Sequence, residues 1–255
     1  MPKVRHWLAI PLALFAAALA LGLVAAHTSL TRSTELTWNS HIQQLRTGWL
    51  NRALLDLANL ASPAGGLVIA VLIALFFLVR RNPVQATATF LVIAVGWNSS
   101  EIAKIIVARH RPPTAYSLAP ETGSNSFPSG HTAFAFSLAV ALCMLAARTR
   151  WFGLAVVLGT LWTVLVGFSR LYIGAHYPFD VLGSILVSTA AIVFLTGLWH
   201  GWIAPNLYRV PLLDRFGPVP GPALVLETGP EAGPEPGPKT GPETGPEAAS
   251  ASVAS

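Results

Sequence analysis

Long apolar segments with almost no charge are the feature that most limits what this chain can fold into. The sequence has six of them, at about residues 7–26, 64–79, 84–103, 131–147, 151–168 and 181–199. A helix of roughly 20 apolar residues crosses the hydrocarbon core of a bilayer. Hydrophobic residue types make up 53% of the chain and charged types only 11%, well below the roughly 25% of soluble domains. The sequence therefore predicts an all-α integral membrane protein, a six-transmembrane-helix bundle.

The two ends of the chain differ from this body. The first apolar segment follows Lys3 and Arg5 and ends in small residues, as a signal peptide does, but its length favours a retained helix. Residues 218–255 are a Gly-Pro-Glu repeat with little to bury. We therefore expect a membrane domain at 1–217 and a disordered tail at 218–255. The lone Cys143 lies in an apolar segment and is expected to be a core residue.

The longest polar connection before the site, residues 27–63, contains an amphipathic pattern over 36–60. Trp38, Ile42, Leu45 and Trp49 recur at helical spacing, and polar residues fill the other faces. Tryptophans favour the membrane–water interface. The pattern predicts one or two helices lying in the headgroup layer, with a small soluble cap as the alternative.

The basic residues give an orientation. Short cytoplasmic loops carry an excess of Lys and Arg. One side of the predicted bundle has eight cations, namely Lys3, Arg5, Arg80, Arg81, Arg148, Arg150, Arg209 and Arg215. The other has seven, namely Arg32, Arg46, Arg52, Lys104, Arg109, Arg111 and Arg170. Three of these seven belong to a candidate anion site described below, and without them the count is eight cations against four. The side with eight cations, which carries both termini, is therefore predicted to be cytoplasmic. The connections 104–130 and 169–180 then share the outer face. Cations placed beside apolar spans do not resemble a nucleic-acid surface, and no nucleic-acid partner is expected.

The first candidate site segment is KIIVARHRPP. Lys104 ends the third apolar segment, Arg111 follows seven residues later, and Pro112 and Pro113 stop any helix there. A cation near the membrane interior is costly. Lys104 therefore either binds an anion, or snorkels to the interface, or pairs with Glu101 one turn earlier.

The second segment is FPSGHTAF, at 127–134. Ser129 is placed to cap the fourth apolar helix, with Gly130 and His131 in its first turn. The amides and dipole of a helix N-terminus attract anions, and glycine allows a ligand to approach the backbone. Plain capping is the alternative, but a capping serine does not require a following histidine.

The third segment is SRLYIGAHYPFD, at 169–180. His176 and Asp180 are four residues apart, so a carboxylate can fix the imidazole tautomer and leave the other ring nitrogen free to attack. Pro178 fits the first turn of the last span, with Asp180 just inside it. Arg170 follows an apolar run, where bidentate binding of oxyanions would explain its presence. An interfacial histidine is the alternative.

Together these segments offer three cations, a helix N-terminus and two histidines. That set suits attack on a dianionic phosphate, with the cations matching charge on its oxygens. One histidine can act as nucleophile and the other as general acid. No acidic cluster suited to magnesium accompanies them, so neither a metal nor another cofactor is expected.

The same residues resemble the phosphatidic acid phosphatase type 2 (PAP2) superfamily. Lys104 with Arg111-Pro112 matches its KxxxxxxRP motif, Pro128 to His131 match PSGH, and Ser169-Arg170, His176 and Asp180 match SRxxxxxHxxxD. The resemblance implies that His176 forms a phosphohistidine, that Asp180 orients it and that His131 protonates the leaving group. It also implies that Lys104, Arg111, Arg170 and the Ser129–Gly130 backbone hold the phosphate without a metal.

The sequence therefore predicts a membrane lipid phosphatase with its site on the outer face of the plasma membrane. The resemblance suggests polyprenyl pyrophosphate, phosphatidylglycerol phosphate or phosphatidate as substrate. A phosphotransferase to a lipid or sugar hydroxyl uses the same residues. A catalytically silent membrane scaffold is the alternative outside enzymes, and the complete set of candidate catalytic residues argues against it.

Overall fold

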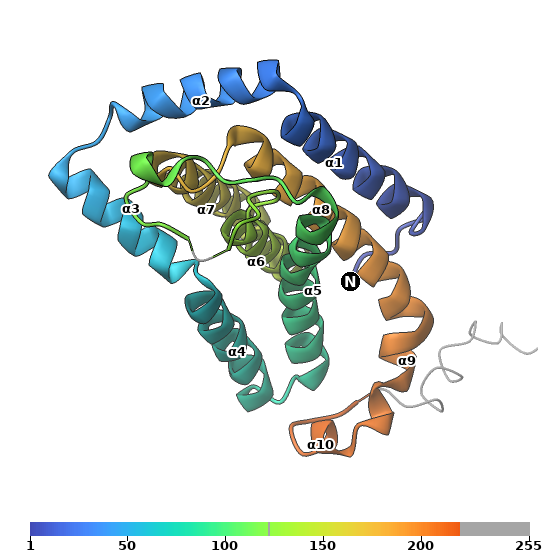
Figure 1. Ribbon diagram of the computed structural model, residues 1–255. Helices are drawn as coiled ribbons and strands as arrows, with labels where there is room; N and C mark the ends of the chain where they lie inside the picture. The colour runs from blue at the N-terminus through green and yellow to red at the C-terminus, as the bar shows by residue number, and fades with distance from the viewer. Residues whose placement is uncertain (122, 220–255) are drawn as a thin grey trace, which may run out of the picture. The chain divides into compact units, whose positions relative to one another are not determined.

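The computed structural model describes residues 1–121 and 123–219, and within these ranges the regular secondary structure is helical apart from one isolated bridge between His110 and Asn125. The longer helices there are α1 (Ala9–His27), α2 (Ser29–Gln43), α3 (Gly48–Leu60), α4 (Pro63–Val79), α5 (Pro83–Val107), α6 (Gly130–Ala146), α7 (Phe152–Ile173) and α8 (Pro178–Leu198) (Figure 1). A π-helical turn at Trp199–Ile203 continues α8 into the short helices α9 (Ala204–Asn206) and α10 (Pro211–Asp214). Nearly all of the predicted tail, 218–255, lies outside the described residues.

All six predicted apolar segments form helices. Four helical stretches are long and apolar enough to cross a membrane, namely α1, α5, α7 and the continuous run Pro178–Arg209. The pair α3 and α4 passes the same test as one span bent by 56°, whereas α6 is apolar but shorter. The membrane class of the protein is thus clear, and the count of six crossings stays a prediction.

Local sequence sets where these helices begin. Ser62 caps α4 by accepting the Gly65 N–H, and Asn82 caps α5 by accepting the Gln85 N–H at 3.1 Å. Each cap is followed by a proline in the first turn, where its missing N–H costs nothing. These Ser-Pro and Asn-Pro pairs explain the sharp turns between neighbouring helices.

The connection expected at 169–180 is shorter in the structure. Helix α7 continues to Ile173, so Arg170 is helical, and only residues 174–177 join α7 to α8. Tyr172 and Ile173 are fully buried. Their burial favours a helix that continues beyond the apolar segment at 151–168. Gly174 ends it with φ of +85°, a conformation that glycine adopts readily.

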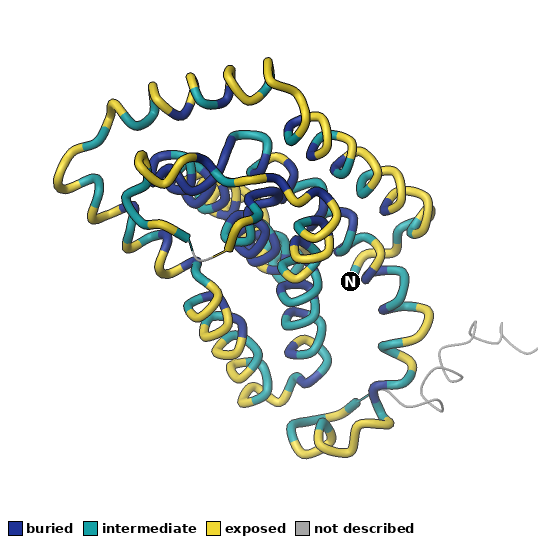
Figure 2. Tube along the Cα trace, in the orientation of Figure 1, coloured by how far each residue is buried: buried dark blue, intermediate teal, exposed yellow. Residues whose placement is uncertain are grey.

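The core lies around α6, which contacts α5, α7 and α8. Its Phe134 is fully buried, and the Trp97 ring of α5 packs edge-on against it at 5.4 Å between centroids. Figure 2 shows buried residues gathered in the centre of the bundle, around α6 and α7, and many exposed residues along α1 to α4. Many outward side chains are large and apolar, for example Leu158 and Leu161 on α7. Such a surface is suited to lipid rather than water.

The segment 36–60 forms two helices, α2 and α3, and α2 runs between α1 and α3 in Figure 1. Trp38 and Trp49 are 47% and 69% exposed, which fits the predicted interfacial face. The opposite face of α2 does not point to solvent, because its buried residues are Glu35 and Asn39. The polar side of this amphipathic helix therefore packs inward, against the site described next.

Candidate active site

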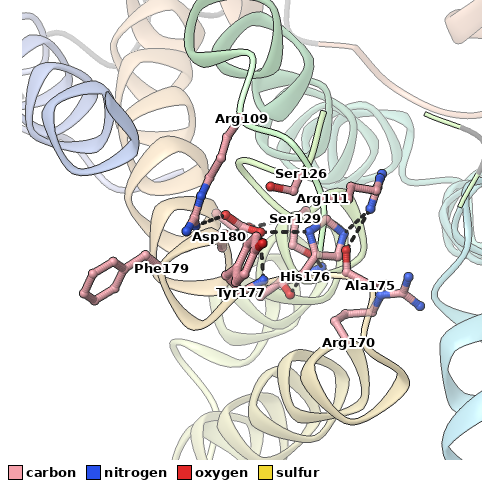
Figure 3. Close-up of polar contacts among 12 residues, drawn as sticks. Arg109, Arg111, Ser126, Ser129, Arg170, Ala175, His176, Tyr177, Phe179 and Asp180 are labelled. Atoms are coloured by element: carbon pink, nitrogen blue, oxygen red, sulfur yellow. Dashed lines mark hydrogen bonds and ion pairs between the residues drawn. The ribbon is translucent and has the colours of Figure 1, made fainter. Parts of the chain in front are cut away.

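The two connections predicted to share one face do meet in the structure. The Ser129 N–H donates to the Asp180 carbonyl at 3.1 Å, and Arg111 Nη1 donates to the Ala175 carbonyl at 3.1 Å. Figure 3 shows His176 between Arg111 and Asp180. One backbone contact and one contact from an arginine side chain therefore bring together two connections that are far apart in the chain.

His176 lies in the short connection before α8 and is almost fully buried. Its Nε2 is 3.2 Å from Arg111 Nη1, and its Nδ1 is 3.4 Å from Asp180 Oδ2. An arginine can only donate, so Nε2 accepts and the proton lies on Nδ1, facing the carboxylate. Burial lowers the pKa of His176 well below its usual range, and the neighbouring Arg111 and Arg170 lower it further. The ring is thus neutral near pH 7, with its lone pair at Nε2.

Asp180 is held from several sides. It occupies the third residue of α8, and its Oδ2 accepts the Tyr177 N–H at 2.9 Å. Its Oδ1 accepts from Arg109 Nη1 at 2.8 Å. The expected placement of Pro178 in the first turn and Asp180 just inside it is confirmed.

A cavity of about 420 Å³ opens beside His176. Predicted site residues on its wall are Lys104, Arg111, Gly130, His131 and His176. The remaining wall comes from Ala61, Pro63, Trp97, Asn98, Glu101 and Glu121. Both predicted histidines therefore border the same cavity, as they must to act on one phosphorus atom.

The predicted cations have acidic partners. Lys104 Nζ is 2.5 Å from Glu101, as the pairing alternative anticipated. Arg170, only 3% exposed, forms an ion pair with Glu121, and Arg111 Nη2 is 3.9 Å from the same carboxylate. Arg170 Nε is buried without a hydrogen-bond partner in the described part of the chain. Two arginines thus converge on one carboxylate at the edge of the cavity.

Ser129 performs the capping role expected of it. Its Oγ accepts from the Thr132 N–H at 3.4 Å and from Thr132 Oγ1 at 3.1 Å. The side chain is fully buried, so it shapes the start of α6 rather than lining the cavity. Gly130 beside it does line the cavity, so an approaching oxyanion meets its backbone.

Three acidic or basic residues of the site were not singled out from the sequence. Arg109 pairs with Asp180 and with Glu35 of α2, and both partners are buried. Burial raises the pKa of Glu35, although the Arg109 pair opposes this. Glu121 contacts the predicted phosphate-binding arginines. Arg109 stands two residues before Arg111, which was the one available signal; Glu35 gave none beyond its place on an amphipathic helix.

A helical membrane bundle with two histidines and several cations around one cavity defines a protein suited to phosphate chemistry. Among the described residues, no group of three or more His, Cys, Asp or Glu side chains is arranged to hold a metal ion. The family model of the PAP2 superfamily matches residues 85–203. This match covers the part of the chain that carries all three motifs, and it confirms the resemblance to the superfamily there.

Relatives and a solved structure extend the match beyond the motifs. The undecaprenyl-diphosphatase of Sulfolobus acidocaldarius is 26% identical over 194 residues, which cover 74% of this chain and 88% of that protein. The undecaprenyl-diphosphatase BcrC of Bacillus subtilis is 40% identical over 75 residues, but the match spans only 36% of that protein. The crystal structure of a transmembrane PAP2-type phosphatidylglycerolphosphate phosphatase from Bacillus subtilis aligns with a TM-score of 0.63 at 27% identity, covering 74% of this chain and 95% of that one.

Proposed function

We propose that this protein is a metal-independent membrane phosphatase that hydrolyses a lipid phosphate or pyrophosphate through a phosphohistidine on His176. The observation that carries the proposal is the state of the His176 ring. Arg111 fixes the lone pair at Nε2, and Asp180 faces the opposite nitrogen. A buried neutral imidazole with an anionic partner behind it is the arrangement that a nitrogen nucleophile requires.

In the first step Nε2 of His176 attacks the phosphorus atom. The N–P bond forms as the bond to the leaving oxygen breaks, and His131 donates a proton to that oxygen. Positive charge then develops on the His176 ring, where Asp180 stabilises it. Lys104, Arg111 and Arg170 stabilise the non-bridging oxygens, displacing their contacts with Glu101 and Glu121.

In the second step water attacks the phosphohistidine. His131, now neutral, takes a proton from the water as the O–P bond forms, and the N–P bond breaks to return His176 to its neutral state. Inorganic phosphate leaves and His131 is again protonated. His176 is thus the nucleophile, and His131 is the general acid in the first step and the general base in the second. The cycle consumes the substrate and one water molecule and no further reactant.

The substrate class follows from the setting of the cavity and from the relatives. The cavity can take a phosphate group, and the surrounding helices present apolar side chains to the bilayer. A lipid can thus place its headgroup in the cavity while its tail stays among hydrocarbon chains. The relatives are named for undecaprenyl diphosphate and phosphatidylglycerophosphate, which supports a lipid substrate of this type. Trp38 and Trp49 would anchor α2 and α3 at the interface.

The proposal includes six crossings, by α1, α4, α5, α6, α7 and α8, with both termini in the cytoplasm. The candidate site uses the ends of α5 and α7 and the beginnings of α6 and α8. The basic connections with Arg80, Arg81, Arg148 and Arg150 join the opposite ends of these helices. The positive-inside rule then supports a site at the outer face of the plasma membrane.

Phosphate release by the purified protein from a panel of lipid phosphates, with EDTA present, tests the function. We expect release from at least one lipid substrate, and strong loss in His176→Ala, His131→Ala and Asp180→Asn. Arg52→Gln, an exposed change on α3, is the matched control and should keep its activity. Full activity in folded His176→Ala protein would overturn the site. Transfer of label to an added alcohol in place of water would indicate the phosphotransferase.

A further inference from the structure

A buried chain of charges lies behind the His176–Asp180 pair, on the side away from the cavity. Arg109 contacts Asp180 Oδ1 through Nη1 and Glu35 Oε2 through Nη2. Its side chain is 3% exposed, and those of Asp180 and Glu35 are 0% and 1% exposed. None of the cavity-lining residues is Arg109 or Glu35. Arg109 and Glu35 therefore reach the His176–Asp180 pair through the hydrogen bond between Arg109 and Asp180.

The guanidinium of Arg109 is fixed in this place. It lies 4.0 Å from the centroid of the Tyr177 ring, a cation–π contact. Its Nη1 donates to Asp180 and also to Glu35 at 3.5 Å, and its Nη2 donates to Glu35. Burying three charged groups is costly, and such networks are weak evidence for stability. A role in holding Asp180 explains the cost better than stability does.

Helix α2 fixes the far end of this chain and the backbone of the catalytic connection. Glu35 Oε1 accepts the Phe179 N–H at 2.9 Å, one of the free amides at the start of α8. Asn39 Nδ2, one turn later on α2, donates to the His176 carbonyl at 3.0 Å. The inward polar face of α2 thus holds both His176 and Phe179, on either side of Tyr177 and next to Asp180.

We propose that Arg109 and Glu35 are positioning residues for the Asp180–His176 pair. Asp180 Oδ2 must face His176 Nδ1 while also accepting the Tyr177 N–H. Arg109 holds the other oxygen and so prevents rotation of the carboxylate. Glu35 in turn holds Arg109 and the start of α8. The inference rests on the proposed function, because it assigns these residues to the same nucleophile.

The test measures kcat and KM for a lipid phosphate in Arg109→Gln, Arg109→Lys and Glu35→Gln proteins. Arg109→Gln should lower kcat by about 10–100-fold, the usual effect of removing a residue that orients a ligating or catalytic group. KM should stay within about threefold, because neither residue lines the cavity. Arg109→Lys and Glu35→Gln should lose less, since each keeps part of the hydrogen bonding.

The matched control is Arg46→Gln. Arg46 also joins the α2–α3 region to the core, by donating to the Tyr172 carbonyl at 2.8 Å and the Tyr116 carbonyl at 2.7 Å. Its hydrogen bonds go to the carbonyls of Tyr116, Tyr172 and Ile173 and do not reach Asp180. If support from α2 alone mattered, Arg46→Gln would lower kcat as much as Arg109→Gln does. We expect kcat within about threefold of the wild-type value.

A double-mutant cycle separates positioning from a general structural effect. In an Asp180→Asn background, Arg109→Gln should lower kcat by less than about threefold further, because the carboxylate that Arg109 holds has been removed. The same factor in both backgrounds would overturn the inference. If Arg109→Gln does not give a monodisperse protein, Glu35→Gln decides the matter. A kcat loss that disappears in Asp180→Asn supports positioning, and a wild-type kcat overturns it.

The cycle also distinguishes this inference from the proposed function. If Asp180→Asn and His176→Ala retain full activity, the assignment of the nucleophile is wrong and both fall. If these two lose activity while Arg109→Gln acts independently of Asp180, only the positioning role falls.

Discussion

Glu121→Gln should increase the affinity of the site for phosphate. The Glu121 carboxylate pairs with Arg170 and is 3.9 Å from Arg111. Both arginines are proposed ligands of the substrate phosphate, so Glu121 and phosphate compete for them. A glutamine of the same shape can still accept a hydrogen bond, but it carries no negative charge to be displaced or to repel an anion.

The expected size follows from the burial of this pair. Hydrogen bonds to charged groups contribute about 1.5–3 kcal/mol. The Glu121 side chain is 26% exposed and Arg170 is 3% exposed, so water partly screens the pair, and about 1–2 kcal/mol is a suitable range. Since about 1.4 kcal/mol is tenfold in affinity, phosphate should bind roughly 5–30 times more tightly.

Competitive inhibition by inorganic phosphate at fixed ionic strength measures this effect. Asp56→Asn on α3 removes an equal charge from an exposed position outside the cavity and serves as the control. The inhibition constant should fall only in Glu121→Gln. An unchanged or higher constant, with the protein folded, would show that Glu121 does not compete for the phosphate arginines.

Three further outcomes follow from the structure. Phe127 is fully buried, and its ring lies so close to Gly22 that a Cβ added at Gly22 would be 2.6 Å from the ring. Phe127→Ala should therefore lower the free energy of unfolding by about 3–5 kcal/mol and lower the melting temperature. Phe76→Ala, at an exposed position, should change the melting temperature little. Burial and the neighbouring arginines lower the pKa of His176, so the acidic limb of kcat/KM due to this residue should lie below about pH 6.5. An acidic limb above pH 7 that moves with substitutions at Arg111 would contradict this. The lowered pKa also affects the free energy of unfolding: below about pH 6.5 the unfolded chain gains a proton on His176 that the folded chain does not, so stability should fall as the pH drops. EDTA treatment should leave activity within about twofold of the untreated enzyme, because arginine and lysine supply the charge that metals provide elsewhere, and loss that is restored by added Mg²⁺ would contradict the metal-independent mechanism.

Apolar length and motif spacing were enough to predict the six helices and much of the site. Each apolar segment is long and free of charge, so packing and lipid both favour a helix whatever the details of its neighbours. The expected place of Pro178 in the first turn of the last span is confirmed, and the apolar segments at 64–79 and 84–103 begin one residue after the starts of α4 and α5. The end of α7 was placed too early, because Arg170 was assumed to leave the helix. Its charge is instead balanced by Glu121, which only the fold brings near.

Within the site, the spacing predicted residues that share a cavity, but not the charges that surround it. His131, His176, Lys104 and Arg111 belong to short segments with recognisable chemistry. Glu35 and Arg109 are 74 positions apart, and their contact depends on how α2 folds back onto the start of α8. An amphipathic pattern gives the two faces of a helix but does not show which face meets protein. For α2 the exposed tryptophans lie outward, and the polar face meets the core.

Trapping of the phosphorylated enzyme shows whether His176 carries the phosphate during turnover. The protein is mixed with a ³²P-labelled lipid phosphate, quenched in base within milliseconds to seconds, and digested for peptide mapping. We expect a base-stable, acid-labile phosphate on the peptide that contains His176, absent in His176→Ala. Label on any other residue, or phosphate release by folded His176→Ala protein at the wild-type rate, would contradict it.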